Sequence, residues 1–154
     1  MPAGPAAVSD LFDAGLVAAT LDTLAKSHRG NEHEMRAAIC KVLKSVLTDG
    51  RARAEQMLLD DRHGRRCAER LCLMLDEIIR LLFEFAAKHL YPSQNPSEAE
   101  RMAVVATGGY GRGLLAPGSD IDLLFLLPYK QTPWGESVAE YRSEERRVGK
   151  ECRL

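Results

Sequence analysis

Residues 104–128 read VVATGGYGRGLLAPGSDIDLLFLLP, and this stretch decides the fold. Its apolar ends predict a short strand over residues 102–106 and a second, nearly all-apolar strand over residues 121–127. An apolar run of the second kind is typical of a central strand covered on both faces. Between the two runs, four glycines fall within six residues, at Gly108, Gly109, Gly111 and Gly113. The stretch therefore predicts two strands joined through a glycine-rich turn.

Two acidic residues, Asp120 and Asp122, stand at the start of the second predicted strand. Side chains two positions apart on a strand point to the same face, about 7 Å from each other. Carboxylates so placed are costly to bury unless a cation neutralises them. Magnesium meets this need, because it binds through one or two carboxylates and the phosphates of a substrate. The alternative is that Asp120 closes the preceding turn and Asp122 is solvated at the strand edge.

The glycine-rich turn supplies the second half of the candidate site. Gly108 and Gly109 follow a strand, and their bare backbone N–H groups can approach phosphate oxygens, especially where a short helix begins. Arg112 can pair with a triphosphate as well. A phosphate-binding turn and a metal-binding acidic pair on neighbouring strands together predict a nucleotidyltransferase, which moves a nucleoside monophosphate from a nucleoside triphosphate.

The same residues resemble a known superfamily. The glycine pair, the spacer and Asp120-Ile121-Asp122 match the pattern of the DNA-polymerase-beta-like nucleotidyltransferases. The longer stretch from about residue 104 to residue 141 resembles the bacterial bifunctional protein-PII uridylyltransferase/uridylyl-removing enzymes, of which this chain would be an N-terminal fragment. The resemblance implies magnesium-dependent transfer of UMP from UTP to a tyrosine of the PII signal protein. It implies no nucleic-acid partner and no membrane partner.

The resemblance also implies roles for individual residues. Asp120 and Asp122 would be the catalytic, metal-binding carboxylates. Gly108 and Gly109 would hold the triphosphate, and Ser119 would support the hook that leads to the acidic pair. Two further readings remain open: another nucleotidyltransferase, such as one that adenylylates glutamine synthetase, and a non-catalytic, truncated nucleotide-binding fragment.

Two departures from the family pattern limit what this chain is expected to do alone. Leu114 stands where the family usually has glutamate. A third carboxylate, which enzymes of the superfamily carry on a later strand, cannot be placed in the sequence. We therefore expect the chain to hold only part of the transfer site and to be inactive by itself.

The first hundred residues predict a helical region. Ser9 and Asp10 are expected to cap a helix that runs to about residue 27, and a second helix continues past Gly50 to about residue 60. The third helix has the clearest apolar stripe, from Cys67 to Phe85, and is long enough to lie across both strands. The predicted class is α+β, with a helical region (residues 1–100) packed beside a truncated nucleotidyltransferase mixed sheet (residues 101–141).

Composition adds a few exclusions. The chain has 21 basic and 22 acidic residues, which argues against a strongly basic nucleic-acid binder. No apolar run is long enough for a membrane span, the cysteines lack zinc-site spacing, and a cytoplasmic location is expected.

Residues 142–154 begin with the charge-rich run RSEERRVGKEC, the translation of a nucleotide string that resembles a sequencing-library adapter. We interpret them as a non-native tail; the alternative is a solvated helix or basic interaction tail.

Overall fold

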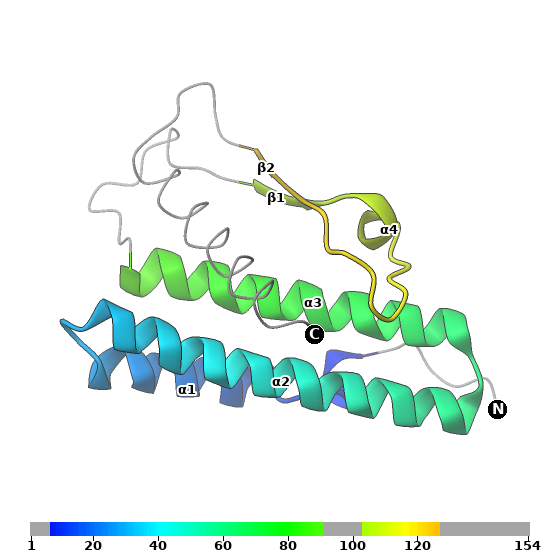
Figure 1. Ribbon diagram of the computed structural model, residues 1–154, viewed down its shortest axis with the longest axis horizontal. Helices are drawn as coiled ribbons and strands as arrows, with labels where there is room; N and C mark the ends of the chain where they lie inside the picture. The colour runs from blue at the N-terminus through cyan, green and yellow to red at the C-terminus, as the bar shows by residue number, and fades with distance from the viewer. Residues whose placement is uncertain (1–6, 91–102, 127–154) are drawn as a thin grey trace.

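The computed structural model describes residues 7–90 and 103–126. Three long helices lie side by side, and a two-stranded sheet with one short helix sits against the third of them (Figure 1). In chain order the helices are α1 (Ala14–Ser27), α2 (Glu32–Asp61), α3 (Gly64–Phe85) and α4 (Gly108–Gly111), with a 3-10 turn η1 (Val8–Asp10) before α1 and a π-helical turn η2 (Ala86–Leu90) after α3. This arrangement confirms the predicted α+β class. In the described ranges, no helix has the length and apolar character needed to cross a membrane.

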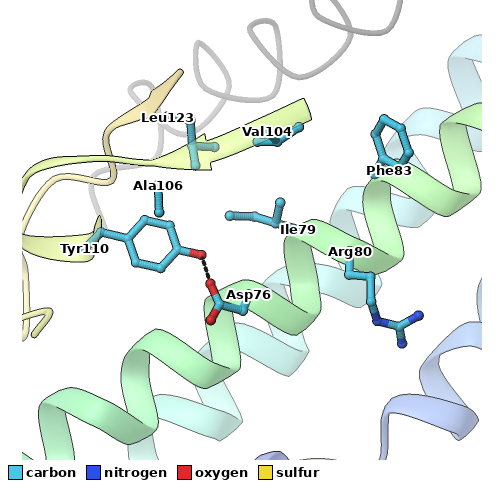
Figure 2. A pocket seen from close by; sticks show the side chains of 8 residues that line it. All are labelled: Asp76, Ile79, Arg80, Phe83, Val104, Ala106, Tyr110 and Leu123. Atoms are coloured by element: carbon cyan, nitrogen blue, oxygen red, sulfur yellow. Dashed lines mark hydrogen bonds between the residues drawn. The ribbon is translucent and has the colours of Figure 1, made fainter. Parts of the chain in front are cut away.

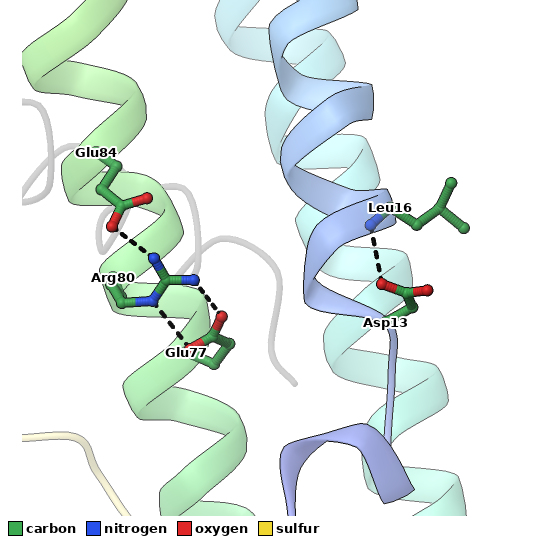
Figure 3. Close-up of polar contacts among 5 residues, drawn as sticks. All are labelled: Asp13, Leu16, Glu77, Arg80 and Glu84. Carbon is green, nitrogen blue, oxygen red and sulfur yellow. Dashed lines mark hydrogen bonds and ion pairs between the residues drawn. The ribbon is translucent and has the colours of Figure 1, made fainter.

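The start of α1 differs from the sequence prediction. Its N-cap is Asp13, whose carboxylate accepts a hydrogen bond of 3.0 Å from the N–H of Leu16 (Figure 3). Ser9 and Asp10 were predicted to cap this helix, and that prediction is wrong because they form the separate turn η1. The chain leaves η1 through Leu11, which is buried, so α1 begins only after that side chain has entered the core.

The core lies among the three long helices, and α3 contributes most to it. Its apolar stripe is buried as predicted, from Cys67 through Met74 to Phe85. Ile39 of α2 and Leu21 of α1 belong to the same buried cluster. Burial of large side chains from all three helices stabilises the layer by roughly 1.5–3 kcal/mol for each fully buried one. The long α2 passes through Gly50 without a break, as predicted.

The sheet consists of β1 (Ala103–Ala106) and β2 (Leu123–Leu126), which pair antiparallel. Ala103 lies opposite Leu126 and Ala106 opposite Leu123, so the two predicted strands are neighbours. The second strand begins at Leu123 rather than at residue 121, which leaves the acidic pair in the segment before the strand. Met102 and Leu127, which were also predicted in strands, lie outside the described residues.

Burial alternates along both strands, so the sheet has two unequal faces. Val105, Leu124 and Leu126 lie on one face and are 37%, 48% and 49% exposed. Val104 and Leu123 are half-buried on the other face, which is turned toward α3 (Figure 2). The prediction that the second strand is covered on both faces is therefore wrong for the part of the chain that the structure describes, where α3 covers one face only.

A polar cluster ties η2 back to α1. The Asp22 carboxylate of α1 accepts a hydrogen bond of 2.8 Å from Nζ of Lys88 and lies 2.7 Å from Nε2 of His89. These two hydrogen bonds, that from Lys88 first, lower the pKa of Asp22 from 3.8 to about 2. The His89 ring also contacts the Phe85 ring, with centroids 5.0 Å apart. The cluster therefore fixes the end of the α3 segment at the side of α1.

The position of the α1 cap can be tested by substitution. We expect Asp13→Ala to lower the free energy of unfolding by about 1 kcal/mol, because it removes the acceptor for a helix N–H. Ser9→Ala, at the cap predicted from sequence, should change it by less than about 0.5 kcal/mol. Urea denaturation followed by circular dichroism measures both variants. Equal losses in the two variants would contradict the observed cap.

The Asp22 cluster predicts a specific dependence of stability on pH. Because the folded pKa of Asp22 lies below its ordinary value, the stabilisation is complete above about pH 4 and is lost as the pH falls toward 2. Asp22→Asn should therefore reduce stability at pH 6 and flatten the decline between pH 4 and pH 2. The control is Asp49→Asn, an exposed carboxylate on α2 that accepts a hydrogen bond from the Ser45 hydroxyl. In Asp49→Asn, the urea midpoint should decline with falling pH across this range as steeply as it does in the wild type.

Candidate nucleotide site

The predicted glycine-rich turn forms a single helical turn, α4, directly after β1. Gly108 has a φ of +61°, a backbone conformation that side-chain-bearing residues rarely adopt. The turn closes with a hydrogen bond of 2.8 Å from the N–H of Gly111 to the carbonyl of Thr107. A short helix thus begins at the glycine pair, which is the condition under which the backbone N–H groups of the turn suit phosphate best. The first N–H groups of a helix have no acceptor within it, which leaves those of Gly108 and Gly109 for another partner.

The turn lies against one of the two predicted acids. A Cβ atom at Gly108 would stand 2.8 Å from Oδ2 of Asp122, so the absence of a side chain allows the carboxylate to approach the backbone. The Asp122 carbonyl accepts hydrogen bonds from the N–H of Thr107 at 3.0 Å and from its hydroxyl at 3.3 Å. These contacts place a carboxylate beside the start of α4.

A second close approach explains Gly111, whose individual role the sequence did not reveal. A Cβ atom at this position would lie 2.5 Å from the carbonyl oxygen of Ala106, which belongs to the backbone of β1. Any larger residue would have to push the turn away from the strand. The absence of a side chain at Gly111 therefore allows α4 to pack closely on β1, and this packing in turn determines the position of Gly108.

The remaining predicted site residues lie on the exposed side of the hook. Arg112 ends α4, and its Nη2 atom would lie 3.8 Å from a Cβ atom built on Gly109. The N–H of Ser119 donates to the carbonyl of Ala116 at 3.0 Å, and both Ser119 and Asp120 are exposed. Of the described residues, none forms a hydrogen bond with the side chain of Ser119 or Asp120. The structure thus places Arg112 and Asp122 beside the glycine pair. Among the described residues, no contact of this kind joins Ser119 or Asp120 to them.

Two buried residues that sequence reasoning missed attach this segment to α3. Tyr110 is 4% exposed, and its hydroxyl donates a hydrogen bond of 2.5 Å to Oδ1 of Asp76 (Figure 2). Leu115 is also 4% exposed and belongs to the core cluster. Its N–H donates a hydrogen bond to the Cys72 thiol, whose pKa is raised chiefly by burial. The sequence does show one aromatic residue, Tyr110, among the glycines. Its partner on α3 could not be predicted, because that contact depends on the tertiary structure.

A hollow of about 280 Å³ opens between α3 and the inner face of the sheet. Figure 2 shows the eight residues that line it: Asp76, Ile79, Arg80, Phe83, Val104, Ala106, Tyr110 and Leu123. The guanidinium of Arg80 is held by Glu77 and Glu84 of its own helix, which raise its pKa (Figure 3). Because its cation is already paired, this hollow is a poor phosphate site.

The chemistry of the acidic pair fits a hard divalent cation bound jointly with a substrate. Among the described residues, no group of three or more histidine, cysteine, aspartate or glutamate side chains converges to hold a metal. Asp120 and Asp122 carry exposed carboxylates, and the second is beside the glycine turn. An ion that takes one or two protein carboxylates and completes its shell with phosphate oxygens suits this donor set.

Comparison with known proteins assigns a class to this geometry. The family model described as nucleotidyltransferase domain matches residues 93–151, which include β1, α4 and β2. The matched range extends beyond both domain boundaries predicted from sequence, at residues 100/101 and 141/142, and therefore does not locate either of them. The class defined by the match is thus the one that the glycine turn and the acidic pair predict. No solved structure matches the chain.

The curated relatives of the chain share one name within that class. The chain is 62% identical over 133 residues to the bifunctional uridylyltransferase/uridylyl-removing enzyme of Bradyrhizobium diazoefficiens, covering 86% of this chain and 14% of that protein. A protein of the same name from another Bradyrhizobium is 65% identical over 129 residues, covering 84% of this chain and 14% of the relative. The one from Rhodopseudomonas palustris is 60% identical over 139 residues, 90% of this chain and 15% of the relative.

The chain is a homologue of the bifunctional uridylyltransferase/uridylyl-removing enzymes, and the family resemblance predicted from its sequence is confirmed. It spans about 14% of the length of these curated relatives.

The close packing of α4 on β1 can be tested at Gly111. Gly111→Ala should lower the free energy of unfolding by about 1–3 kcal/mol, because the new methyl group must displace the strand carbonyl. Gly64→Ala is the matched control, since a Cβ atom at the start of α3 would meet nothing within 4 Å. It should change stability by less than about 0.5 kcal/mol. Equal urea midpoints for the two variants would show that α4 does not press on β1.

Proposed function

We propose that this chain carries part of the UTP-binding and metal-binding site of a uridylyltransferase that transfers UMP from UTP to a tyrosine of the PII nitrogen-regulatory protein. The approach of the Gly108 turn to the Asp122 carboxylate is the observation that carries the proposal. It supports the proposal because backbone N–H groups, which suit phosphate, and a carboxylate, which suits a divalent cation, then lie close together. The names of the relatives and the family match support the same activity.

The nucleotide is proposed to bind at the start of α4. Backbone N–H groups of Gly108 and Gly109 donate to the triphosphate, and the guanidinium of Arg112 beside Gly109 offsets its charge. Ser119 supports the hook that leads from this turn to the acidic pair. These four residues form the nucleotide-binding part of the proposal, and each retains a backbone or side-chain donor on an accessible segment.

Magnesium is proposed to be held by Asp120 and Asp122 together with the triphosphate. When bound, the ion offsets the negative charge that develops on the phosphoryl oxygens during transfer. The two carboxylates are also the proposed catalytic residues. A carboxylate at this position can accept the proton of the incoming hydroxyl group.

In the proposed reaction the tyrosine hydroxyl of PII attacks the α-phosphate of UTP. A bond forms between the phenolic oxygen and the α-phosphorus, the bond to the bridging oxygen of the β-phosphate breaks, and pyrophosphate leaves. The phenolic proton passes to a carboxylate of the acidic pair. Because Leu114 replaces the usual glutamate and the third carboxylate is not placed, we propose that this chain binds the nucleotide but does not catalyse transfer alone.

We propose the domain organisation that the sequence predicts. Residues 1–100 form the helical region and residues 101–141 the start of the nucleotidyltransferase domain, while residues 142–154 are a non-native tail. The transfer would take place in the cytoplasm, where its nucleotide and protein substrates are present.

The proposal predicts magnesium-dependent binding of UTP that requires the acidic pair. Asp122→Ala should weaken binding by about tenfold or more, because it removes a ligand to the ion that bridges protein and triphosphate. Asp49→Ala, on an exposed stretch of α2, should bind as the wild type does. Isothermal titration with UTP, with and without magnesium, measures both variants, and ATP serves as the competing nucleotide. Tighter binding of ATP would favour an adenylyltransferase, and binding insensitive to Asp122→Ala would contradict the proposed site.

A further inference from the structure

The polar side chain of Tyr110 attaches the glycine turn to the helical layer. Tyr110 is the third residue of the GGYG turn, and its ring is buried although its neighbour Gly108 is exposed. The ring reaches across the edge of the hollow, and its hydroxyl meets Asp76 on α3 at 2.5 Å (Figure 2). Asp76 lies on the exposed side of its helix, off the buried stripe. Its carboxylate therefore remains in reach of both Tyr110 and water.

The turn is constrained on its other side by the strands. Gly108 rests against the Asp122 carboxylate, and Gly111 rests against the Ala106 carbonyl. These contacts limit how far the turn can move toward β1 and β2, and buried Leu115 anchors the residues that follow the turn on α3. The Tyr110 hydroxyl adds a directional restraint within the turn itself, because a hydrogen bond holds its donor and acceptor within a narrow range of angles.

We infer that Tyr110 is a positioning residue for the nucleotide site, and that its hydrogen bond to Asp76 holds the N–H groups of Gly108 and Gly109 in register with the Asp122 carboxylate. The inference rests on the proposed function for the identity of the ligand, UTP with magnesium. It adds a residue of α3 to the determinants of that site. Tyr110 acts through the backbone of the turn and does not itself touch the nucleotide.

Four variants separate the hydroxyl contact from general packing. Tyr110→Phe removes the hydroxyl and keeps the buried ring, while Asp76→Ala removes its acceptor. Asp76→Asn keeps an acceptor oxygen at the same position and is the conservative replacement. Arg80→Gln is the matched control, because Arg80 lines the same hollow on α3 but pairs with Glu77 and Glu84.

The first measurement is the affinity of the full chain for UTP with magnesium. Tyr110→Phe and Asp76→Ala should each weaken binding by about three- to tenfold, as expected for loss of one charge-assisted hydrogen bond. The double variant should be no weaker than either single one, because both remove the same contact. Asp76→Asn and Arg80→Gln should bind within about twofold of the wild type. Wild-type affinity in Tyr110→Phe, or losses that multiply in the double variant, would overturn the inference.

The second measurement does not require nucleotide. In chain labelled with 15N-glycine, the amide signals of Gly108, Gly109 and Gly111 should shift, and their hydrogen exchange should accelerate, in Tyr110→Phe and Asp76→Ala but not in Asp76→Asn or Arg80→Gln. Unchanged signals in Tyr110→Phe would overturn the inference whether or not UTP binds. Absence of UTP binding by the wild type, with these glycine shifts present, would instead refute the proposed function and leave Tyr110 as the residue that sets the turn.

Discussion

The approach of a carboxylate to a backbone that has no side chain is the contact on which the candidate site depends. Gly108 adopts a positive φ and leaves room for Oδ2 of Asp122, where a Cβ atom would stand 2.8 Å away. The two hydrogen bonds from Thr107 to the Asp122 carbonyl hold the two segments in this relation. The glycine turn and an acidic side chain would otherwise have no reason to share a position, because residues 116–120 of the hook between them are exposed.

The helical layer makes this contact possible, although no helix of the layer supplies one of the predicted site residues. Two short strands rarely form a stable sheet by themselves. Here the inner face of β1 and β2 is turned toward α3, and two residues of this region join the buried core: Tyr110 within the glycine segment and Leu115 just after it. The buried stripe of α3 is therefore the support on which the turn and the hook rest, and the packing of α1 and α2 holds α3 in place.

The features that could be predicted from the sequence are those with a regular apolar period and those that require a particular residue type, such as glycine. The helical period of α3 is visible from Cys67 to Phe85, and the crowded glycines indicated a tight turn between strands. The sequence did not predict that Asp13 rather than Ser9 caps α1, since both residues are good caps and burial of Leu11 decides between them. Nor did it predict the partner of Tyr110. That hydrogen bond joins residues 34 positions apart and follows from how the sheet lies on α3.

The same distinction applies to the acidic pair. Alternation along a strand predicted one face for Asp120 and Asp122, but the strand begins only at Leu123. The hydrogen bond from the N–H of Thr107 to the Asp122 carbonyl continues the register of the two strands by one pair beyond Ala106 and Leu123. This pairing positions Asp122, while Asp120 remains on the exposed hook. Local pattern thus singled out the two acids, while the position of Asp122 beside Gly108 follows from the pairing of the two strands.

The most direct test of this account is paramagnetic broadening by manganese, used in place of magnesium, on chain labelled with 15N-glycine. In the presence of UTP, the amide signals of Gly108 and Gly109 should broaden most among the twelve glycines, with Gly30 and Gly64 unaffected. Such a pattern would place the ion and the nucleotide at the turn beside Asp122. Broadening that is uniform over the glycines, or strongest away from residues 108–113, would contradict the account.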